Sequence, residues 1–454
     1  MLTTLAAPAF ADIWHIEDGD ITVKAGETGN DVTQKGTTTY GDTDTIITNS
    51  DKNTASSHTV TIETNDKNDK VEVTLKDVNI DTSSRNNAAV SVTGSGNTTI
   101  KLDGDNALKS DIYRSGIYGS GSGSLTISGG ENDSLTAQGG SGADGIYSSG
   151  SLTISGGTVT ANGDDGGRGI SSRGGVTISG GSTVTANGES GTISGGDGIC
   201  SDSGDVTISG GSTVTAKGGD GGSFGGGSGI SSFNRVAISG STVTANGGNG
   251  GNVSGDSKDG YGGDGIYSND IDLSGSLELT AKAGSPNGKA LSQKGSELVL
   301  DTIKDKLGPG AKVTATDADG NVIDQVPIPR PVEPEGPVIP EESSSSSDGG
   351  SAAPSAPAFS LPGLTVTDKD GQRISYTSTQ SGNTLTVCVG RFTASFRISL
   401  ATLRQLRAAG IETITFQTVL CSTTLSLDEL LAMGGEDAEA VLTHRFTDSS
   451  LTVG

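Results

Sequence analysis

The stretch Gly145-Ile-Tyr-Ser-Ser-Gly-Ser-Leu-Thr-Ile-Ser-Gly-Gly-Thr-Val-Thr-Ala161 contains three short apolar segments, and variants of it recur from Gly116 to Gly284. The segments are Gly-Ile, then apolar-x-apolar-Ser, then apolar-Thr-Ala, and a Gly-rich loop follows the third. The isoleucines of the first segment are 29, 24, 29, 31 and 36 residues apart, at Ile117, Ile146, Ile170, Ile199, Ile230 and Ile266. A repeat of this length is typical of a solenoid.

Each segment alternates apolar and polar residues between Gly or Ser, which predicts a strand with one buried face. Stacked copies would bury that face at the inter-strand spacing of about 4.8 Å. The sequence therefore predicts an all-β fold over residues 12–326, a right-handed parallel β-helix with three strands per coil. Weaker alternation in residues 12–110 predicts the first coils, with Trp14 in an N-terminal cap.

The last part of the chain differs in composition. Residues 327–361 are rich in Pro and Ser and predict a linker. Residues 362–454 predict a small α+β domain, with helices at 400–409 and 426–433 that end at Gly410 and Gly434. Cys388 and Cys421 lie in this domain and could pair if the protein is exported.

The first residues, 1–11, end in Ala9-Phe10-Ala11, the small-x-small form of a signal-peptidase site. We interpret them as the remnant of a signal peptide; the alternative is a chance Ala-rich terminus. No later stretch has the roughly 20 apolar residues of a membrane span. We therefore expect a secreted or cell-surface protein without membrane insertion.

Composition narrows the class of partner. The 454 residues include 73 Gly, only 4% are aromatic, and the net charge is −25. Because the apolar residues are periodic, the high Gly content indicates an ordered solenoid with a thin core rather than disorder. The acidic charge repels phosphate backbones and anionic lipid, so we expect no nucleic-acid partner.

Aromatic residues provide the candidate binding surface. Side chains alternate along a strand, so the residue after each Gly-Ile isoleucine should point outward. Tyr118, Tyr147 and Tyr267 occupy that position, and Phe224, Phe233 and Tyr261 lie in or beside the loops. These rings could stack against sugar rings; the alternative is that they cover the surface under the loops.

Aspartates provide the candidate metal ligands. Asp144, Asp197 and Asp264 each lie two residues before the isoleucine that begins a coil, and 139–147 matches the calcium-binding nonapeptide of β-rolls once. Carboxylates at a loop-to-strand junction could bind Ca²⁺ together with backbone carbonyls. The alternative, which the sequence favours, is that Asp supplies turn chemistry before the strand.

Catalytic groups are sparse. Histidine occurs only at His15, His58 and His444, in separate regions, so no Ser-His-Asp set or histidine metal site can be assembled. The repeat region has few basic residues, among them Arg168, Arg173 and Arg235, each in or beside a loop. The sequence predicts no catalytic residues.

The order of motifs resembles a group of bacterial exported proteins described as carbohydrate-binding-domain or pectate-lyase-like β-helix proteins. The stretches that carry the resemblance are 71–80, 88–92 and 99–108, followed by the Gly-Ile coils. The resemblance implies a right-handed β-helix at the cell surface that binds plant polysaccharide, with Ca²⁺ as a candidate cofactor. Enzymes of that fold are polysaccharide lyases, which place acidic Ca²⁺ ligands and a basic residue on one face.

We therefore predict a non-enzymatic surface protein that binds polysaccharide or cell-surface glycan through its outer strand face and loops. The first alternative is a structural or adhesive solenoid that binds protein partners, in which the loop 247–265 would be important. A polysaccharide lyase is the third. The C-terminal domain could itself bind a protein partner.

Overall fold

The computed structural model describes residues 12–251, 260–327 and 364–453, the last range with gaps at 369–371, 375, 382, 390, 392, 419–421, 434–437 and 445–448. The expected signal-peptide remnant, nearly all of the linker and Cys421 lie outside the described residues. The chain divides into two compact units, with the boundary between Glu333 and Pro334. The first unit contains the repeats.

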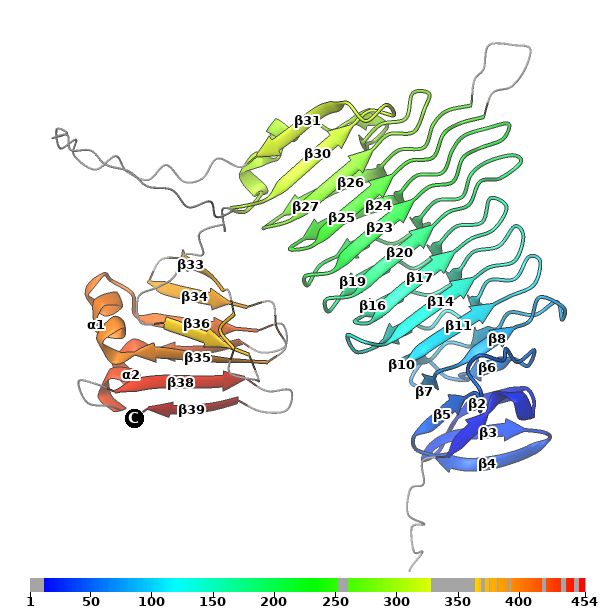
Figure 1. The fold of residues 1–454 in the computed structure, drawn as a ribbon, viewed down its shortest axis with the longest axis horizontal. Coiled ribbons are helices and arrows are strands. Elements are labelled where there is room, and N and C mark those ends of the chain that lie inside the picture. Colours follow the sequence, from blue (N-terminus) through cyan, green and yellow to red (C-terminus); the bar gives the residue numbers. More distant parts are fainter. Residues whose placement is uncertain are drawn as a thin grey trace, which may run out of the picture. The chain divides into compact units, whose positions relative to one another are not determined.

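The repeats form long parallel ladders, as Figure 1 shows. The first ladder joins β9 (Val90–Thr93), β12 (Ile117–Gly119), β15 (Ile146–Ser148), β18 (Ile170–Ser172), β21 (Ile199–Ser201), the first parts of β24 (Ile230–Ser239) and β26 (Ile266–Ser274), and β28 (Leu291–Gln293). The second joins β7 (Lys70–Lys76), β10 (Asn97–Asp103), β13 (Leu125–Ser128), β16 (Leu152–Ser155), β19 (Val176–Ser179), β22 (Val206–Ile208) and the later parts of β24 and β26. The predicted parallel stacking of the repeats is confirmed.

The third ladder forms a separate sheet. It joins β8 (Asn79–Asp81), β11 (Asp105–Lys109), β14 (Ser134–Gln138), β17 (Thr158–Asn162), β20 (Thr183–Asn187), β23 (Thr213–Lys217), β25 (Thr242–Asn246), β27 (Glu278–Lys282) and β30 (Lys312–Thr316). Every pair is parallel and in register, so equivalent residues of successive copies lie side by side.

The core is an aliphatic column inside these ladders. In one coil the fully buried side chains are Ile146, Leu152, Ile154, Val159 and Ala161. Burying a Val, Leu or Ile side chain contributes about 1.5–3 kcal/mol. A coil gains this only when neighbouring coils cover it.

The first corner of the coil depends on the residues between the first two segments. Buried serines satisfy the backbone there: Ser201 Oγ donates to Gly204 O (2.8 Å) and accepts from Gly204 N (3.2 Å). In β24 and β26 the corresponding residues contain no Gly, and both segments run on as one strand of 10 and 9 residues. The two predicted strands are therefore continuous in those coils, since the tight Gly turn is missing.

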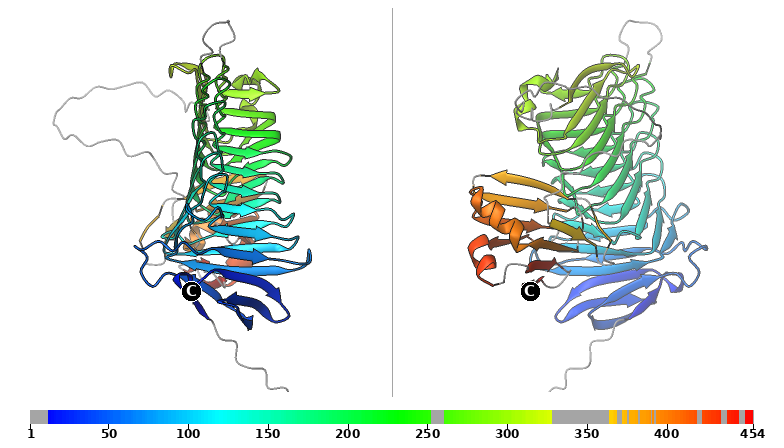
Figure 2. Two further views of the ribbon diagram at one scale, coloured as in Figure 1. Left: turned by 90° about the vertical axis from the view of Figure 1, so that its right-hand side faces the viewer. Right: turned by 60° about the vertical axis from the view of Figure 1, so that its left-hand side comes forward.

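The Gly-rich loops are stacked on one another, as Figure 2 shows. A chain of backbone hydrogen bonds of 2.7–3.0 Å crosses them, from Gly284 N through Gly263, Gly248, Gly227, Gly219 and Gly196 to Glu189 O. A Cβ at Gly196, Gly227 or Gly263 would lie 1.9–2.0 Å from a backbone oxygen of the preceding loop. Because no side chain fits at this distance, glycine is required at these positions. We call these stacked loops the glycine layer.

The N-terminal end of the column is covered by an antiparallel meander. The chain begins with β1 (Ile13–His15) and a 3-10 turn (Ile16–Asp18). The meander itself consists of three antiparallel strands, β2 (Ile21–Gly26), β3 (Gly29–Gln34) and β4 (Thr37–Asp42). The next two strands, β5 (Thr45–Thr48) and β6 (Val60–Glu63), join the parallel ladders. The sequence predicted only further coils here. Trp14 packs against the end of the core, and its Nε1 donates to Asp42 (3.0 Å), which is the predicted role of this residue.

The other end of the first unit closes with two hairpins. In the first hairpin, β28 pairs with β29 (Ser296–Glu297). Two 3-10 turns follow, Leu300–Thr302 and Lys304–Lys306. In the second hairpin, β30 pairs antiparallel with β31 (Val322–Pro327). Leu298, Leu300 and Ile303 are buried there. These residues cap the C-terminal end of the repeats.

The second unit has two four-stranded sheets among its described residues. The strand order of the first sheet is β32 (Leu364–Thr367), β35 (Ala394–Ser399), β38 (Glu439–His444) and β39 (Ser449–Val453). The strand order of the second is β33 (Thr377–Ser381), β34 (Thr384–Cys388), β36 (Thr413–Gln417) and β37 (Ser422–Ser426). The predicted helices are present as α1 (Leu400–Ala408) and α2 (Leu427–Met433). Its core contains Phe396 and Phe416, with ring centroids 4.9 Å apart.

Candidate functional site

Two of the predicted outward tyrosines lie together on the first ladder. Tyr118 and Tyr147 are partners in register, and their rings stack with centroids 5.4 Å apart and an interplanar angle of 17°. Tyr147 Oη lies 3.1 Å from Ser149 Oγ. Tyr118 is 36% exposed and Tyr147 is half-buried, so the pair offers both ring edges and hydroxyls to a ligand.

A second aromatic pair lies further along the same ladder. Phe233 and Tyr267 contact edge to face, with centroids 6.0 Å apart and an angle of 78°. Phe233 is 59% exposed and Tyr267 is half-buried. Tyr147 and Tyr267 are four rungs apart on the ladder, which corresponds to roughly 19 Å at the usual strand spacing.

The three rungs between the aromatic pairs hold small residues that the surrounding polar groups cover. They are Ser171, Cys200 and Ser231, all buried. Arg168 Nη1 contacts Ser171 Oγ (3.4 Å) and Asp202 (3.5 Å). These three residues share the register of the outward tyrosines, but they are not exposed, because polar side chains from the loops and corners lie over them.

Cys200 is chemically inert in this setting. Burial, reinforced by nearby Asp197, raises the pKa of its thiol to about 12. The thiol therefore stays protonated at neutral pH and is a poor nucleophile.

The remaining predicted aromatics lie at the edge of the glycine layer. Phe224 and Tyr261 are 63% and 70% exposed. Phe224 N donates to Ile193 O (2.8 Å) and Gly226 N donates to Tyr261 O (2.9 Å), so the three loops lie side by side. Ile193, also exposed, completes an apolar row. A lone isoleucine in a Gly-rich loop carries no sequence signal that would have marked it.

The three predicted metal ligands have one structural role in common. Each carboxylate Oδ1 accepts from the backbone N–H at the equivalent position of the next coil: Asp144 from Arg168 (2.8 Å), Asp197 from Ser228 (2.7 Å) and Asp264 from Lys289 (2.7 Å). The carboxylates thus tie each loop to the loop of the following coil.

Their electrostatic surroundings differ from those of a shared metal centre. Burial raises the pKa of Asp144 and of Asp264. Arg168 lies between two of the aspartates, with its Nε 3.8 Å from Asp197. Within the described ranges, no group of three or more His, Cys, Asp or Glu side chains could hold a metal ion. A Ca²⁺ ion, which takes about six to eight oxygens, would need most of its ligands from backbone carbonyls here.

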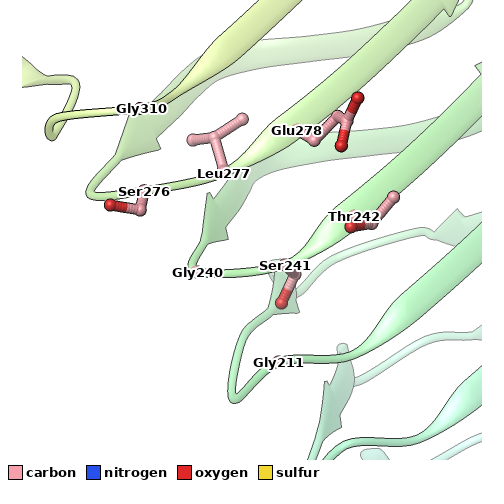
Figure 3. A pocket seen from close by; sticks show the side chains of 8 residues that line it. All are labelled: Gly211, Gly240, Ser241, Thr242, Ser276, Leu277, Glu278 and Gly310. Carbon is pink, nitrogen blue, oxygen red and sulfur yellow. The ribbon is translucent and has the colours of Figure 1, made fainter. Parts of the chain in front are cut away.

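A shallow depression of about 230 Å³ lies at the corner before the third ladder, as Figure 3 shows. It is lined by Gly211, Gly240, Ser241, Thr242, Ser276, Leu277, Glu278 and Gly310. The turn at Gly240 has one residue fewer than the preceding turn, which contains Gly210 and Gly211. The shorter turn leaves this corner hollow, and its open shape gives a ligand little enclosure.

Two of the three arginines named in the repeat region, Arg168 and Arg235, are held in ion pairs. Arg235 contacts Asp205 (2.9 Å) and Asp272 (3.9 Å), and Arg168 contacts Asp197 and Asp202. Each arginine thus lies beside two carboxylates, a neighbourhood that the sequence could not predict. An arginine that stays paired and protonated is a poor general base.

No protein-family model, no curated protein and no solved structure matches this chain. Of the described residues, none belongs to a helix with the length and apolar character needed to cross a membrane.

Proposed function

We propose that this chain is an exported, non-enzymatic protein of the cell surface that binds polysaccharide through a right-handed, three-stranded β-helix. The observation that carries the proposal is the alignment of Tyr118, Tyr147 and Tyr267 on one ladder, with partly exposed rings. Rings in one row suit a linear ligand that runs along the solenoid axis. Aromatic faces and edges are common contacts for the apolar faces of sugars, and the hydroxyls supply hydrogen bonds.

The distance between the two aromatic pairs supports a chain rather than a single sugar. Roughly 19 Å separates Tyr147 from Tyr267, which is longer than one monosaccharide. The polar groups between them, Arg168, Asp197 and Asp202, carry both signs of charge. They suit a neutral chain better than a strongly anionic one, since the two carboxylates outnumber the single arginine.

The test uses the full chain on a glycan array that includes cellulose and polygalacturonate, in Ca²⁺ and again in EDTA. We expect Tyr147→Ala and Tyr267→Ala each to weaken glycan binding about tenfold, on the scale of one lost aromatic contact. Tyr40→Ala is the matched control, because Tyr40 is 77% exposed in β4 and belongs to neither pair. Absence of binding across the array, or equal losses in all three variants, would overturn the proposal.

The EDTA arm tests the calcium prediction separately. Binding that disappears in EDTA would assign the Asp144, Asp197 and Asp264 positions a metal-binding role. Binding that persists would leave them with the loop-tying role.

The second candidate is an adhesive solenoid that binds protein. The apolar row of Ile193, Phe224 and Tyr261 favours it, because exposed apolar groups gathered on one edge are typical of interaction sites. Part of the loop 247–265 lies outside the described residues. Phe224→Ala should reduce cell adhesion under this candidate and leave glycan affinity unchanged. A lyase stands third, because Arg168 and Arg235 are ion-paired.

A further inference from the structure

The outer face of the third ladder carries a regular array of threonines. The four successive strands β17, β20, β23 and β25 each place two threonines on this face, and the pairs align in register: Thr158 and Thr160, Thr183 and Thr185, Thr213 and Thr215, and Thr242 and Thr244. We call these eight residues the threonine grid. The four strands run in nearly the same direction (Figure 1), so the rows stay aligned.

The grid is uncharged and its hydroxyls are available. Among the described residues, none of the eight hydroxyls has a hydrogen-bond partner within the protein, and all eight side chains are exposed or half-buried. The chain as a whole has a net charge of −25. Charged side chains lie only beside the grid, such as Glu278 on the next strand and Lys217 at the end of β23. The partner that complements this face is therefore neutral and forms hydrogen bonds.

The spacing of the grid selects among neutral partners. Neighbouring threonines along the ladder are about 4.8 Å apart, and the two on one strand are about 6.6 Å apart. Both distances are too long for direct O–H···O bonds of about 2.8 Å. A single water with tetrahedral geometry that bonds two oxygens at that length holds them about 4.6 Å apart. The ladder repeat therefore nearly equals the second-neighbour oxygen distance of a tetrahedral water network.

Ordered water can then extend from the grid in two dimensions. One water bridges each pair of hydroxyls along the ladder, and two can span the wider gap along a strand. Fixed β-sheet geometry sets these positions, so the waters need no rearrangement to join an ice lattice. The four strands of the grid contain no aromatic residue on which a sugar could stack.

The simpler explanation is that threonine only favours strands and tolerates solvent. That preference acts on every outward position of the coil. On the first ladder the same coils carry Tyr147, Ser171, Cys200 and Ser231. On the second they carry one threonine per strand, Thr153, Thr177 and Thr207, followed by Ala237. Only the third ladder keeps threonine at two positions per strand through four coils. Strand preference alone does not account for this difference.

We propose that the threonine grid is an ice-binding face. This site is independent of the proposed glycan face, which uses the first ladder. The test measures how much of the full chain enters slowly growing polycrystalline ice, together with the thermal hysteresis of its solution. Wild-type protein should be enriched in the ice fraction and should produce faceted crystals.

The variant Thr183→Lys/Thr213→Lys places two charged chains on exposed, adjacent grid positions. We expect it to lose ice enrichment entirely. Thr177→Lys, on the second ladder, is the control and should retain enrichment; circular dichroism of both variants checks the fold. The conservative variant Thr213→Ser, which keeps the hydroxyl but removes the methyl, should lose part of the enrichment.

Exclusion of wild-type protein from ice would overturn the proposal, and so would equal enrichment of the grid variant and the control. A parallel measurement on microcrystalline cellulose covers the main competing partner. Adsorption to cellulose that the grid variant abolishes, without ice enrichment of the wild type, would reject ice and assign the face to a crystalline polysaccharide.

Discussion

The glycine layer makes a quantitative prediction at Gly196. In Gly196→Ala the new Cβ would lie 2.0 Å from the carbonyl oxygen of Gly167. Reaching an ordinary contact of 3.4 Å requires the two loops to separate by about 1.4 Å. That movement breaks bonds that join these two loops, from Glu189 N to Gly167 O (3.0 Å) and from Gly169 N to Asp197 O (3.0 Å). Two buried backbone bonds lost without replacement cost about 2–4 kcal/mol.

The matched control is Gly181→Ala. Gly181 has a positive φ of 70°, and a Cβ there would meet nothing within 4 Å. An alanine in this left-handed conformation costs about 1–2 kcal/mol and disturbs only its own turn. The two substitutions thus separate the effect of close packing in the layer from the general cost of replacing a glycine.

The assay is hydrogen–deuterium exchange of the loops 163–169 and 188–198, read by mass spectrometry. A local loss of 2 kcal/mol speeds exchange roughly 30-fold. Gly196→Ala should show this in both loops, and Gly181→Ala should show no change in either. Unchanged exchange in the Gly196 variant would refute the close-packed layer.

Three further predictions concern titratable groups. Partial burial would raise the pKa of Asp20, but Arg85 and neighbouring hydrogen-bond donors hold it at about 2. The ionised Asp20 carboxylate therefore stabilises the folded state above about pH 3.8, and this stabilisation is lost as pH falls toward 2. Because Asp20 is half exposed, Asp20→Asn should cost on the order of 1 kcal/mol at pH 7 and little at pH 2, measured by urea unfolding. Burial lowers the pKa of His444, so the second unit should lose stability as pH falls below about 6.5, and His444→Gln should flatten that part of the unfolding curve. Cys200 should resist iodoacetamide at pH 8 until urea unfolds the first unit, whereas rapid labelling of the native protein would contradict its burial.

The sequence predicted the stacked repeats well because their signal is carried by side chains. Ile146, Ile154 and Val159 alternate with polar residues, and the same alternation recurs in each copy, so both the buried face and the pairing partner follow from the pattern. The cap role of Trp14 and the two C-terminal helices were predictable for a related reason. A large apolar side chain such as Trp14 must be buried against other apolar groups, and a helix shows a regular spacing of apolar residues. Both signals can be read from the local sequence.

The features that the sequence did not predict are held by backbone contacts or by distant residues. The meander of β2 to β4 has the same alternation as a coil, so the pattern cannot distinguish antiparallel from parallel pairing. In the second unit, β33 and β37 were missed because these short polar segments gain strand structure from their neighbours. β38 and β39 were missed as well, although β38 alternates buried Ala440 and Leu442 with less buried residues. The burial of Ser171 and Cys200 depends on Arg168 and Asp202, which contact each other from two successive coils.

Stacking gives every outer row of the solenoid the same repeat, about 4.8 Å, so the faces differ only in which side chains fill the row and for how many coils. On the first ladder, aromatic rungs at Tyr147 and Tyr267 are separated by small buried ones, which offers isolated contacts to a flexible linear chain. On the third ladder the threonines continue without interruption in two dimensions, from Thr158 to Thr244, which offers equal contacts to a rigid lattice. A ligand that can adjust its own spacing suits the first arrangement, and one with a fixed spacing requires the second. Under the two proposals above, the number of successive coils that keep the same residue distinguishes a face for a rigid partner from a face for a flexible one.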